Sequence, residues 1–293
     1  MKTSLVTLFL LSSVLISNVS AQDQRVIYGE DNRKDIFEVT NPLFINLAAS
    51  TAAQISTTSL SSTLSGDIQV MGRTLVDRNI CAKEKFSSQI SAARCSGFLV
   101  GDDLLLTAGH CIKDQTDCNS YSWVFDFKMT QANQSVMRVK NEAVYKCSKI
   151  IARALDNATL NDFALVKLDR VVAGRKPLVL SKVGTVAVGT DLVVIGHPSG
   201  LASKVADGAK VRANTNPFYF VANTDTYGGN SGSAVFNAKT GVVEGILVRG
   251  EQDYIYDYNL SCSVSKVCAT DDCRGEDIIK VDQLAKYFSS FID

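Results

Sequence analysis

Short apolar runs bounded by turn-forming residues limit the fold of this chain more than any other feature. From about residue 93 onward, β-branched and aliphatic residues recur in short runs separated by Gly, Asp or Asn. Runs this short are typical of strands in an all-β barrel or sandwich. The clearest runs are 97–100, 104–107, 163–168, 192–196, 210–213 and 245–248. Residues 282–291 differ, because their helical spacing predicts a C-terminal α-helix that closes the fold.

The first 21 residues have the pattern of a signal peptide. Lys2 precedes a short apolar core over residues 5–16, and small residues lead up to Ala21. A membrane anchor is the alternative, but this core is well short of the roughly 20 residues that span a bilayer. We therefore expect a secreted chain with no membrane association after cleavage. Residues 22–25 are a short propeptide if processing follows Arg25, although an ordinary surface arginine fits equally well.

Downstream of Arg25, the expected organisation is an N-terminal extension over 26–66 and one main domain over 67–293. The extension has loose helical spacing over 42–55 and a Ser/Thr-rich, turn-forming stretch over 56–65. No long segment of the later chain is apolar enough to span a bilayer.

Charge and cysteine content narrow the class of protein further. The chain has 30 basic and 30 acidic side chains, so no net charge favours nucleic acid or an anionic membrane. Eight cysteines in an exported chain predict disulfides. A metal site is not expected, since the sequence has two histidines and no Cys-x-x-Cys pair. We expect a monomer.

His110 stands in a setting that suits acid–base chemistry. Residues 107–111 read TAGHC after an apolar run, and the small neighbours leave an imidazole accessible to a substrate. Cys111 follows Cys95 by sixteen positions, and a disulfide between them would tie the histidine turn to the preceding strand. The alternative is a buried structural histidine.

Asp162 begins the apolar run that reads NDFALVKL over 161–168. A buried carboxylate needs a hydrogen-bond partner, and a histidine N–H is a suitable one. Taken alone, this residue fits a solvated loop aspartate better.

The strongest motif is GGNSGSAV over residues 228–235. A serine hydroxyl becomes a nucleophile only when a base takes its proton, and the developing oxyanion needs donors. Gly229 allows its own N–H and that of Ser231 to point into one oxyanion hole, and Gly232 removes bulk beside Ser231. A flexible glycine-serine loop is the alternative, but an apolar run follows at once.

Together these three segments resemble those of trypsin-like serine proteases, in which the order is also His, Asp, Ser. The stretch 225–233, the Gly-His-Pro at 196–198 and the segments 26–27 and 32–33 are similar to the staphylococcal V8, or glutamyl endopeptidase, branch. The resemblance implies two six-stranded antiparallel β-barrels with the site in the cleft between them. It implies a serine endopeptidase acting on protein or peptide substrates, with His110 as base, Asp162 orienting it and Ser231 as nucleophile. No cofactor is required.

Specificity stays open at this point. Asp225 occupies the position of the aspartate that binds Lys or Arg in trypsin, while glutamyl-type relatives use a histidine where Leu247 stands here. The expected S1 pocket residues are Asp225, Thr226, Leu247 and Gly250. Asn230 cannot form the ion pair that activates trypsin-like zymogens, and we expect His197 to be a structural turn residue.

Two other functions compete with this reading. An inactive homologue that acts as a binding protein is the first, although all three triad residues are present. An esterase of another fold is the second, but its Gly-x-Ser-x-Gly elbow is incomplete here and its histidine would come last. The pairing of Cys81, Cys118, Cys147, Cys262, Cys268 and Cys273 cannot be read from sequence.

Overall fold

A computed structural model describes residues 27–182, 186–269, 272–284 and 287 of the chain. The expected signal peptide over 1–21, the expected propeptide over 22–25 and most of the expected C-terminal helix lie outside these residues. A 3-10 turn over Val281–Leu284 covers the start of that last stretch. In the described part, no helix reaches the length and apolar character of a membrane span.

Six antiparallel strands close the first barrel, with β3 hydrogen-bonded to both β8 and β10. Its strands are β3 (Thr51–Ser56), β8 (Ala93–Leu99), β9 (Leu104–Thr107), β10 (Tyr121–Phe125), β12 (Val144–Leu155) and β13 (Asp162–Leu168). Because β3 lies within the stretch that sequence assigned to an extension, the barrel begins at Thr51 and not at residue 67. This corrects the expected domain boundary.

The second barrel also has six antiparallel strands and is closed where β14 pairs with β15. Its strands are β14 (Asp191–Gly196), β15 (Lys204–Ala213), β16 (Tyr219–Ala222), β17 (Ala234–Asn237), β18 (Val243–Arg249) and β22 (Glu276–Lys280). The short strand β2 (Arg33–Asp35) adds to the outside of β15, so the N-terminal segment is attached to this barrel. The expectation of two six-stranded barrels is confirmed.

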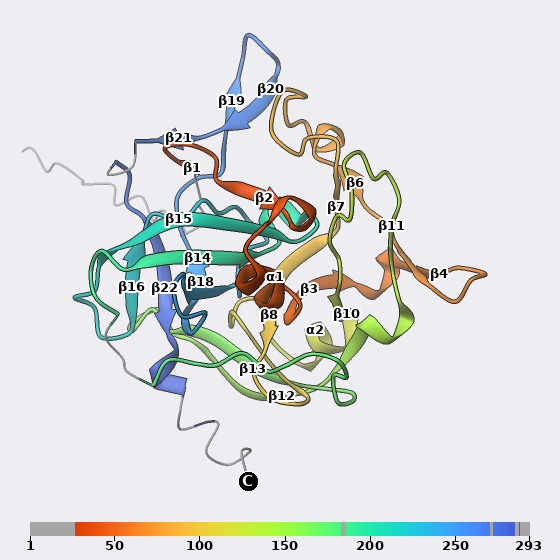
Figure 1. Ribbon diagram of the computed structural model, residues 1–293, viewed down its shortest axis with the longest axis horizontal. Coiled ribbons are helices and arrows are strands. Elements are labelled where there is room, and N and C mark those ends of the chain that lie inside the picture. Colours follow the sequence, from red (N-terminus) through yellow and green to blue (C-terminus); the bar gives the residue numbers. More distant parts are fainter. Residues whose placement is uncertain (1–26, 183–185, 270–271, 285–286, 288–293) are drawn as a thin grey trace, which may run out of the picture.

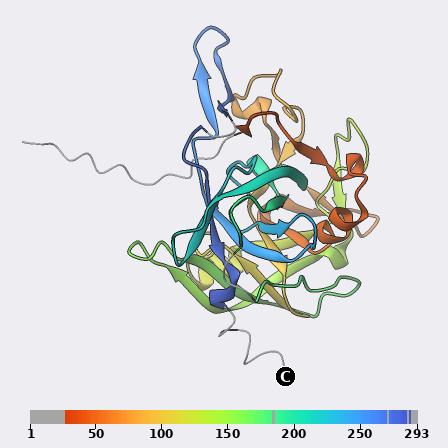
Figure 2. The ribbon, with the colours of Figure 1, turned by 60° about the vertical axis from the view of Figure 1, so that its left-hand side comes forward.

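Smaller elements surround the barrels (Figure 1). Helix α1 (Pro42–Ala48) begins where the Asn41 side chain accepts the Leu43 N–H, and Pro42 stands at its first position, as helix starts favour. The hairpin of β19 and β20 projects from the barrels in both views (Figures 1 and 2). The remaining elements are α2 (Gln115–Ser120), β1 (Ile27–Tyr28), β4 (Leu60–Ser62), β5 (Ile68–Val70), β6 (Arg73–Thr74), β7 (Ile90–Ser91), β11 (Met137–Val139), β19 (Tyr254–Asp257), β20 (Cys262–Ser265) and β21 (Val267–Cys268).

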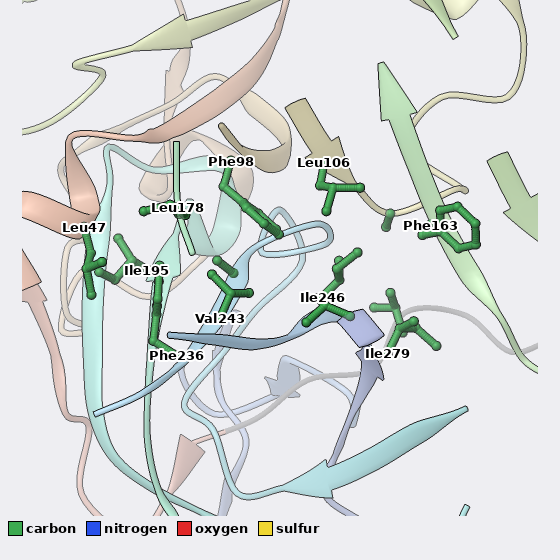
Figure 3. Close-up of a cluster of buried hydrophobic side chains, with 14 of the residues drawn as sticks. Leu47, Phe98, Leu106, Phe163, Leu178, Ile195, Phe236, Val243, Ile246 and Ile279 are labelled. Atoms are coloured by element: carbon green, nitrogen blue, oxygen red, sulfur yellow. The ribbon is translucent and has the colours of Figure 1, made fainter. Parts of the chain in front are cut away.

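One hydrophobic cluster contains side chains from both barrels. Figure 3 shows Phe98 and Leu106 of the first barrel facing Val243 and Ile246 of the second, and all four side chains are buried. Burial of a large aliphatic or aromatic side chain contributes about 1.5–3 kcal/mol. This shared core fixes the relative position of the barrels, and therefore of the residues at their junction.

Four disulfides hold all eight cysteines. The expected Cys95–Cys111 bond is present. The pairs that sequence left open are Cys81–Cys262, Cys118–Cys147 and Cys268–Cys273.

Candidate active site

His110 is held at the end of the first barrel by a glycine that no other residue can replace without movement. Residue 109 passes so close to β12 and β13 that an added Cβ would lie 2.8 Å from the Phe163 carbonyl oxygen and would overlap that of Ala154. Arg153 Nε also donates to the Gly109 carbonyl oxygen at 2.8 Å. Gly109 is therefore a packing requirement of the barrel.

Two hydrogen bonds hold His110 against Asp162, one from the imidazole ring and one from the backbone. The ring Nδ1 lies 2.7 Å from Asp162 Oδ2, and the backbone N–H of His110 donates to Oδ1 at 3.0 Å. Asp162 is almost fully buried. Burial alone would raise the pKa of Asp162, but the hydrogen bonds and charge of His110, together with Arg249, lower it overall. A buried, ionised carboxylate on Nδ1 fixes the tautomer that leaves Nε2 as the proton acceptor.

Arg249 is a neighbour of this pair that sequence reasoning missed. Its NH1 atom lies 3.9 Å from Asp162 Oδ2, and its Nε lies 3.2 Å from Asp277 Oδ2. The apolar run of β18 ends at this arginine, and a charge at the end of a buried strand was the only available signal.

Ser231 lies in the second of two consecutive tight turns between β16 and β17 of the second barrel. The Asn230 N–H donates to Tyr227 O at 2.9 Å, and the Ser233 N–H donates to Asn230 O at 2.8 Å. The third residue of each turn is a glycine with positive φ, +97° at Gly229 and +85° at Gly232, as type II turns require. Turn geometry thus explains Gly229 and Gly232 of the GGNSGS motif.

The Ser231 turn packs directly on the histidine strand. The Ser231 carbonyl oxygen accepts the Ser96 N–H at 2.8 Å and lies 3.7 Å from Cys111 Sγ. A Cβ on Gly232 would lie 2.9 Å from the Ala108 nitrogen. The structure therefore brings Ser231 and His110 to the same place, at the Cys95–Cys111 disulfide.

The other ring nitrogen of His110, Nε2, has no hydrogen-bond partner among the described residues. Catalytic hydrogen bonds are often long or misaligned in a free enzyme and shorten when substrate binds.

The Ser96 side chain stabilises the turn that contains Gly229, a role that sequence reasoning did not assign. Its hydroxyl donates to Gly229 O at 2.8 Å and accepts the His197 N–H at 3.0 Å. Within the described residues, no acceptor is found for the Gly229 N–H. This N–H is consequently available to stabilise an oxyanion.

His197 is buried behind this turn, as expected for a structural residue. Its ring Nδ1 lies 3.0 Å from Leu201 O, and burial lowers the pKa of His197 to about 4. The neighbouring Asn230 side chain accepts a hydrogen bond from the Ser233 hydroxyl at 3.2 Å, so it stabilises the second turn.

The four S1 residues expected from sequence differ in what they contact. Thr226 and Gly250 both contact the carboxylate of Glu276, which sequence reasoning missed. Leu247 is fully buried in the core of the second barrel, which corrects its expected position in the pocket. Asp225 is also buried, and both of its oxygens accept N–H groups of the N-terminal segment.

The His110 environment does not form a metal site. A ring nitrogen of His110 and the sulfur atoms of Cys95 and Cys111 lie within 4.8 Å of one another. The two sulfurs are bonded to each other, so neither is a thiolate that could bind a metal.

Solved structures of known proteases resemble this chain in overall fold. A solved glutamyl endopeptidase ("Structure of Glu endopeptidase in complex with MPD") has a TM-score of 0.52 and 14% identity, covering 90% of this chain and 98% of that one. The active form of the Rv3671c protease from M. tuberculosis has a TM-score of 0.48 and 14% identity, covering 94% and 93%. No curated protein sequence matches the chain.

The sequence profile of the trypsin-like peptidase domain matches residues 95–246. This match covers more than half of the chain and contains His110, Asp162 and Ser231. The chain therefore belongs to the trypsin-like peptidase family.

Proposed function

We propose that this protein is a secreted serine endopeptidase in which Ser231 is the nucleophile, His110 the general base and Asp162 the residue that orients it. The double hydrogen bond between His110 and Asp162, beside the turn that carries Ser231, is the observation that supports this most strongly. Secretion is supported by the signal-like residues 1–21 and by four disulfides, which suit an oxidising compartment.

In this mechanism His110 Nε2 takes the Ser231 proton as the serine oxygen attacks the scissile carbonyl carbon. The N–H groups of Gly229 and Ser231 stabilise the oxyanion, and loss of one such donor costs roughly 2.7–4 kcal/mol in the barrier. His110 then gives its proton to the leaving amine, and an acyl-enzyme forms. Water activated by His110 releases the acid product and regenerates the serine.

The test is hydrolysis of an internally quenched peptide library by the purified, exported protein. We expect cleavage by the wild type and only background cleavage by Ser231→Ala and His110→Ala. Ser65→Ala is the matched control, because Ser65 is an exposed serine distant in sequence from the site, and it should retain full activity. Absence of cleavage by the folded wild type would favour an inactive homologue that acts as a binding protein.

Processing after Arg25 is part of the same proposal. Ile27 and Tyr28 are buried and pair with Val267 and Cys268, so the expected cleavage point directly precedes an ordered strand. N-terminal sequencing of the exported protein tests this. A mature chain that begins at Gln22 and is fully active would contradict processing at Arg25.

A further inference from the structure

Strand β18 and Gly250, which follows it, run beside the turn that carries Ser231 and form one side of the region next to Ser231. The Gly232 N–H donates to Leu247 O at 2.8 Å, and the Leu247 N–H donates to Ser233 O at 3.0 Å. Residues 248–250 continue from this contact. A substrate side chain next to the scissile bond therefore meets this strand on one side and the segment leading to Ser231 on the other.

Asp225, the acidic residue expected to bind a cationic side chain, instead accepts hydrogen bonds from the backbone of the N-terminal segment. Its Oδ1 accepts the Tyr28 N–H at 2.8 Å and its Oδ2 accepts the Asn32 N–H at 2.9 Å. Both carboxylate oxygens thus anchor the N-terminal segment to the second barrel. This geometry favours an anchoring role over substrate recognition.

Glu276, the first residue of β22, places its carboxylate between the two sides of this region. The Thr226 hydroxyl donates to Oε2 at 3.0 Å, and the Glu251 N–H donates to Oε1 at 3.3 Å. Thr226 belongs to the segment that leads to Ser231, and Glu251 follows the strand described above. One carboxylate therefore contacts both segments, and it is fully buried there.

Gly250 explains how the carboxylate reaches this position. A Cβ on residue 250 would overlap both oxygens of Glu276. Positive φ is not the reason for glycine here, because residue 250 is not among the glycines with that conformation. Close approach of the carboxylate is the requirement that glycine meets, and a carboxylate at this point is a built feature of the site.

Two further carboxylates lie along this region, and Lys266 neutralises one of them. Lys266 pairs with Glu251 at 3.0 Å, and the Gly228 N–H donates to Asp253 Oδ2 at 2.8 Å. Burial and the charge of Glu276 also raise the pKa of the Tyr28 phenol. A cationic side chain entering here would be attracted, while an acidic one would meet like charge in a poorly solvated site.

We propose that Glu276 is the specificity-determining residue of the S1 pocket and that the enzyme cleaves after Lys or Arg. This inference rests on the proposed peptidase function and names its substrate class. The P1 cation binds the Glu276 carboxylate, and Asp225 holds the N-terminal segment without contacting the substrate.

The experiment uses peptide substrates that differ only at P1, with Arg, Lys, Ala, Leu or Glu before a chromogenic leaving group. Glu276→Gln keeps the size of the side chain and an oxygen that can accept from Thr226, while removing the charge. We expect kcat/KM for P1 Arg to fall roughly 100-fold in this variant, because a close charge pair in a desolvated site is removed. The rate for P1 Ala should change little. The Arg-to-Ala ratio is the readout, since it does not depend on the fraction of folded enzyme.

Asp225→Asn is the comparison variant, and it should leave the Arg-to-Ala ratio unchanged. Benzamidine binding to Ser231→Ala, measured by calorimetry, tests the pocket without catalysis, and the further change Glu276→Gln should abolish it. A P1 preference for Ala, Leu or Glu, or an Arg preference lost in Asp225→Asn and kept in Glu276→Gln, would overturn the inference. Either result would leave the peptidase function intact, whereas absence of cleavage at every P1 would refute that function instead.

Discussion

Gly109→Ala is the substitution that most directly links barrel packing to catalysis. The new Cβ would lie 2.8 Å from the Phe163 carbonyl oxygen and would overlap the Ala154 carbonyl oxygen, whereas ordinary contact begins at 3.4 Å. Both neighbours are strand backbone and cannot rotate away. The turn must therefore move by about 0.6 Å or more, and such overpacking costs about 1–3 kcal/mol of stability.

The same movement reaches the adjacent imidazole. His110 is held to Asp162 by bonds of 2.7 and 3.0 Å, which leave little room before hydrogen-bond geometry is lost. A displacement approaching 1 Å in an active site can reduce the rate by about 100-fold. We expect kcat to fall by one to two orders of magnitude, while KM changes little because residue 109 does not line the pocket.

Urea denaturation and steady-state kinetics on a peptide substrate measure the two effects. Gly101→Ala is the matched control, because its new Cβ would lie 3.2 Å from side-chain atoms of Leu104, which can adjust. The reasoning is refuted if Gly109→Ala unfolds at the same urea concentration as Gly101→Ala and retains wild-type kcat.

Three further predictions concern the triad, the central disulfide and the response to pH. Asp162→Asn should lower kcat by roughly 10⁴-fold with KM nearly unchanged, as steady-state kinetics would show, because the amide favours the wrong His110 tautomer. Replacing Cys95 and Cys111 by serine should lower the free energy of unfolding by about 3 kcal/mol for a loop of this length, measured by urea denaturation. Asp225 has a pKa raised by burial from 3.8 to about 6, so its stabilisation is complete below pH 3.8 and is lost as the pH rises through 6. The pKa of His197 is lowered by burial from 6.5 to about 4, so its contribution is present above pH 6.5 and is lost as the pH falls through 4. Between pH 6 and 4, the free energy of unfolding of Asp225→Asn should therefore fall more steeply on acidification than that of the wild type, by roughly 1–3 kcal/mol. That of His197→Gln should fall less steeply, by a similar amount. Urea denaturation at each pH measures both, and variant profiles parallel to the wild-type profile would contradict both assignments.

Features carried by local sequence were predictable. His110, Asp162 and Ser231 each stand beside a short apolar run, so the strands next to them could be inferred from the runs. The two barrels were implied by the resemblance to trypsin-like proteases. The Cys95–Cys111 bond was also accessible, since both cysteines flank one hairpin. The run beside Ser231 belongs to the second barrel, whereas those beside His110 and Asp162 belong to the first. The hydrophobic core that the barrels share brings the three runs together.

Features that depend on distant partners were not predictable. Asp225 contacts Tyr28 across 197 positions, and the role of Glu276 follows from its contact with Thr226 across 50. Leu247 was misplaced because adjacent residues of a strand face opposite sides, and its face depended on the barrel register. Strand β3 was missed because α1 immediately precedes it and gives the combined stretch a helical spacing.

Covalent labelling of Ser231 tests the central claim most directly. The wild-type protein is treated with a sulfonyl fluoride, digested and mapped by mass spectrometry, with His110→Ala treated in parallel. We predict one adduct per chain, on Ser231, that forms in the wild type and is nearly absent in His110→Ala. A wild type without an adduct, or one that labels equally fast without the imidazole, would contradict the assignment of these two residues as nucleophile and base.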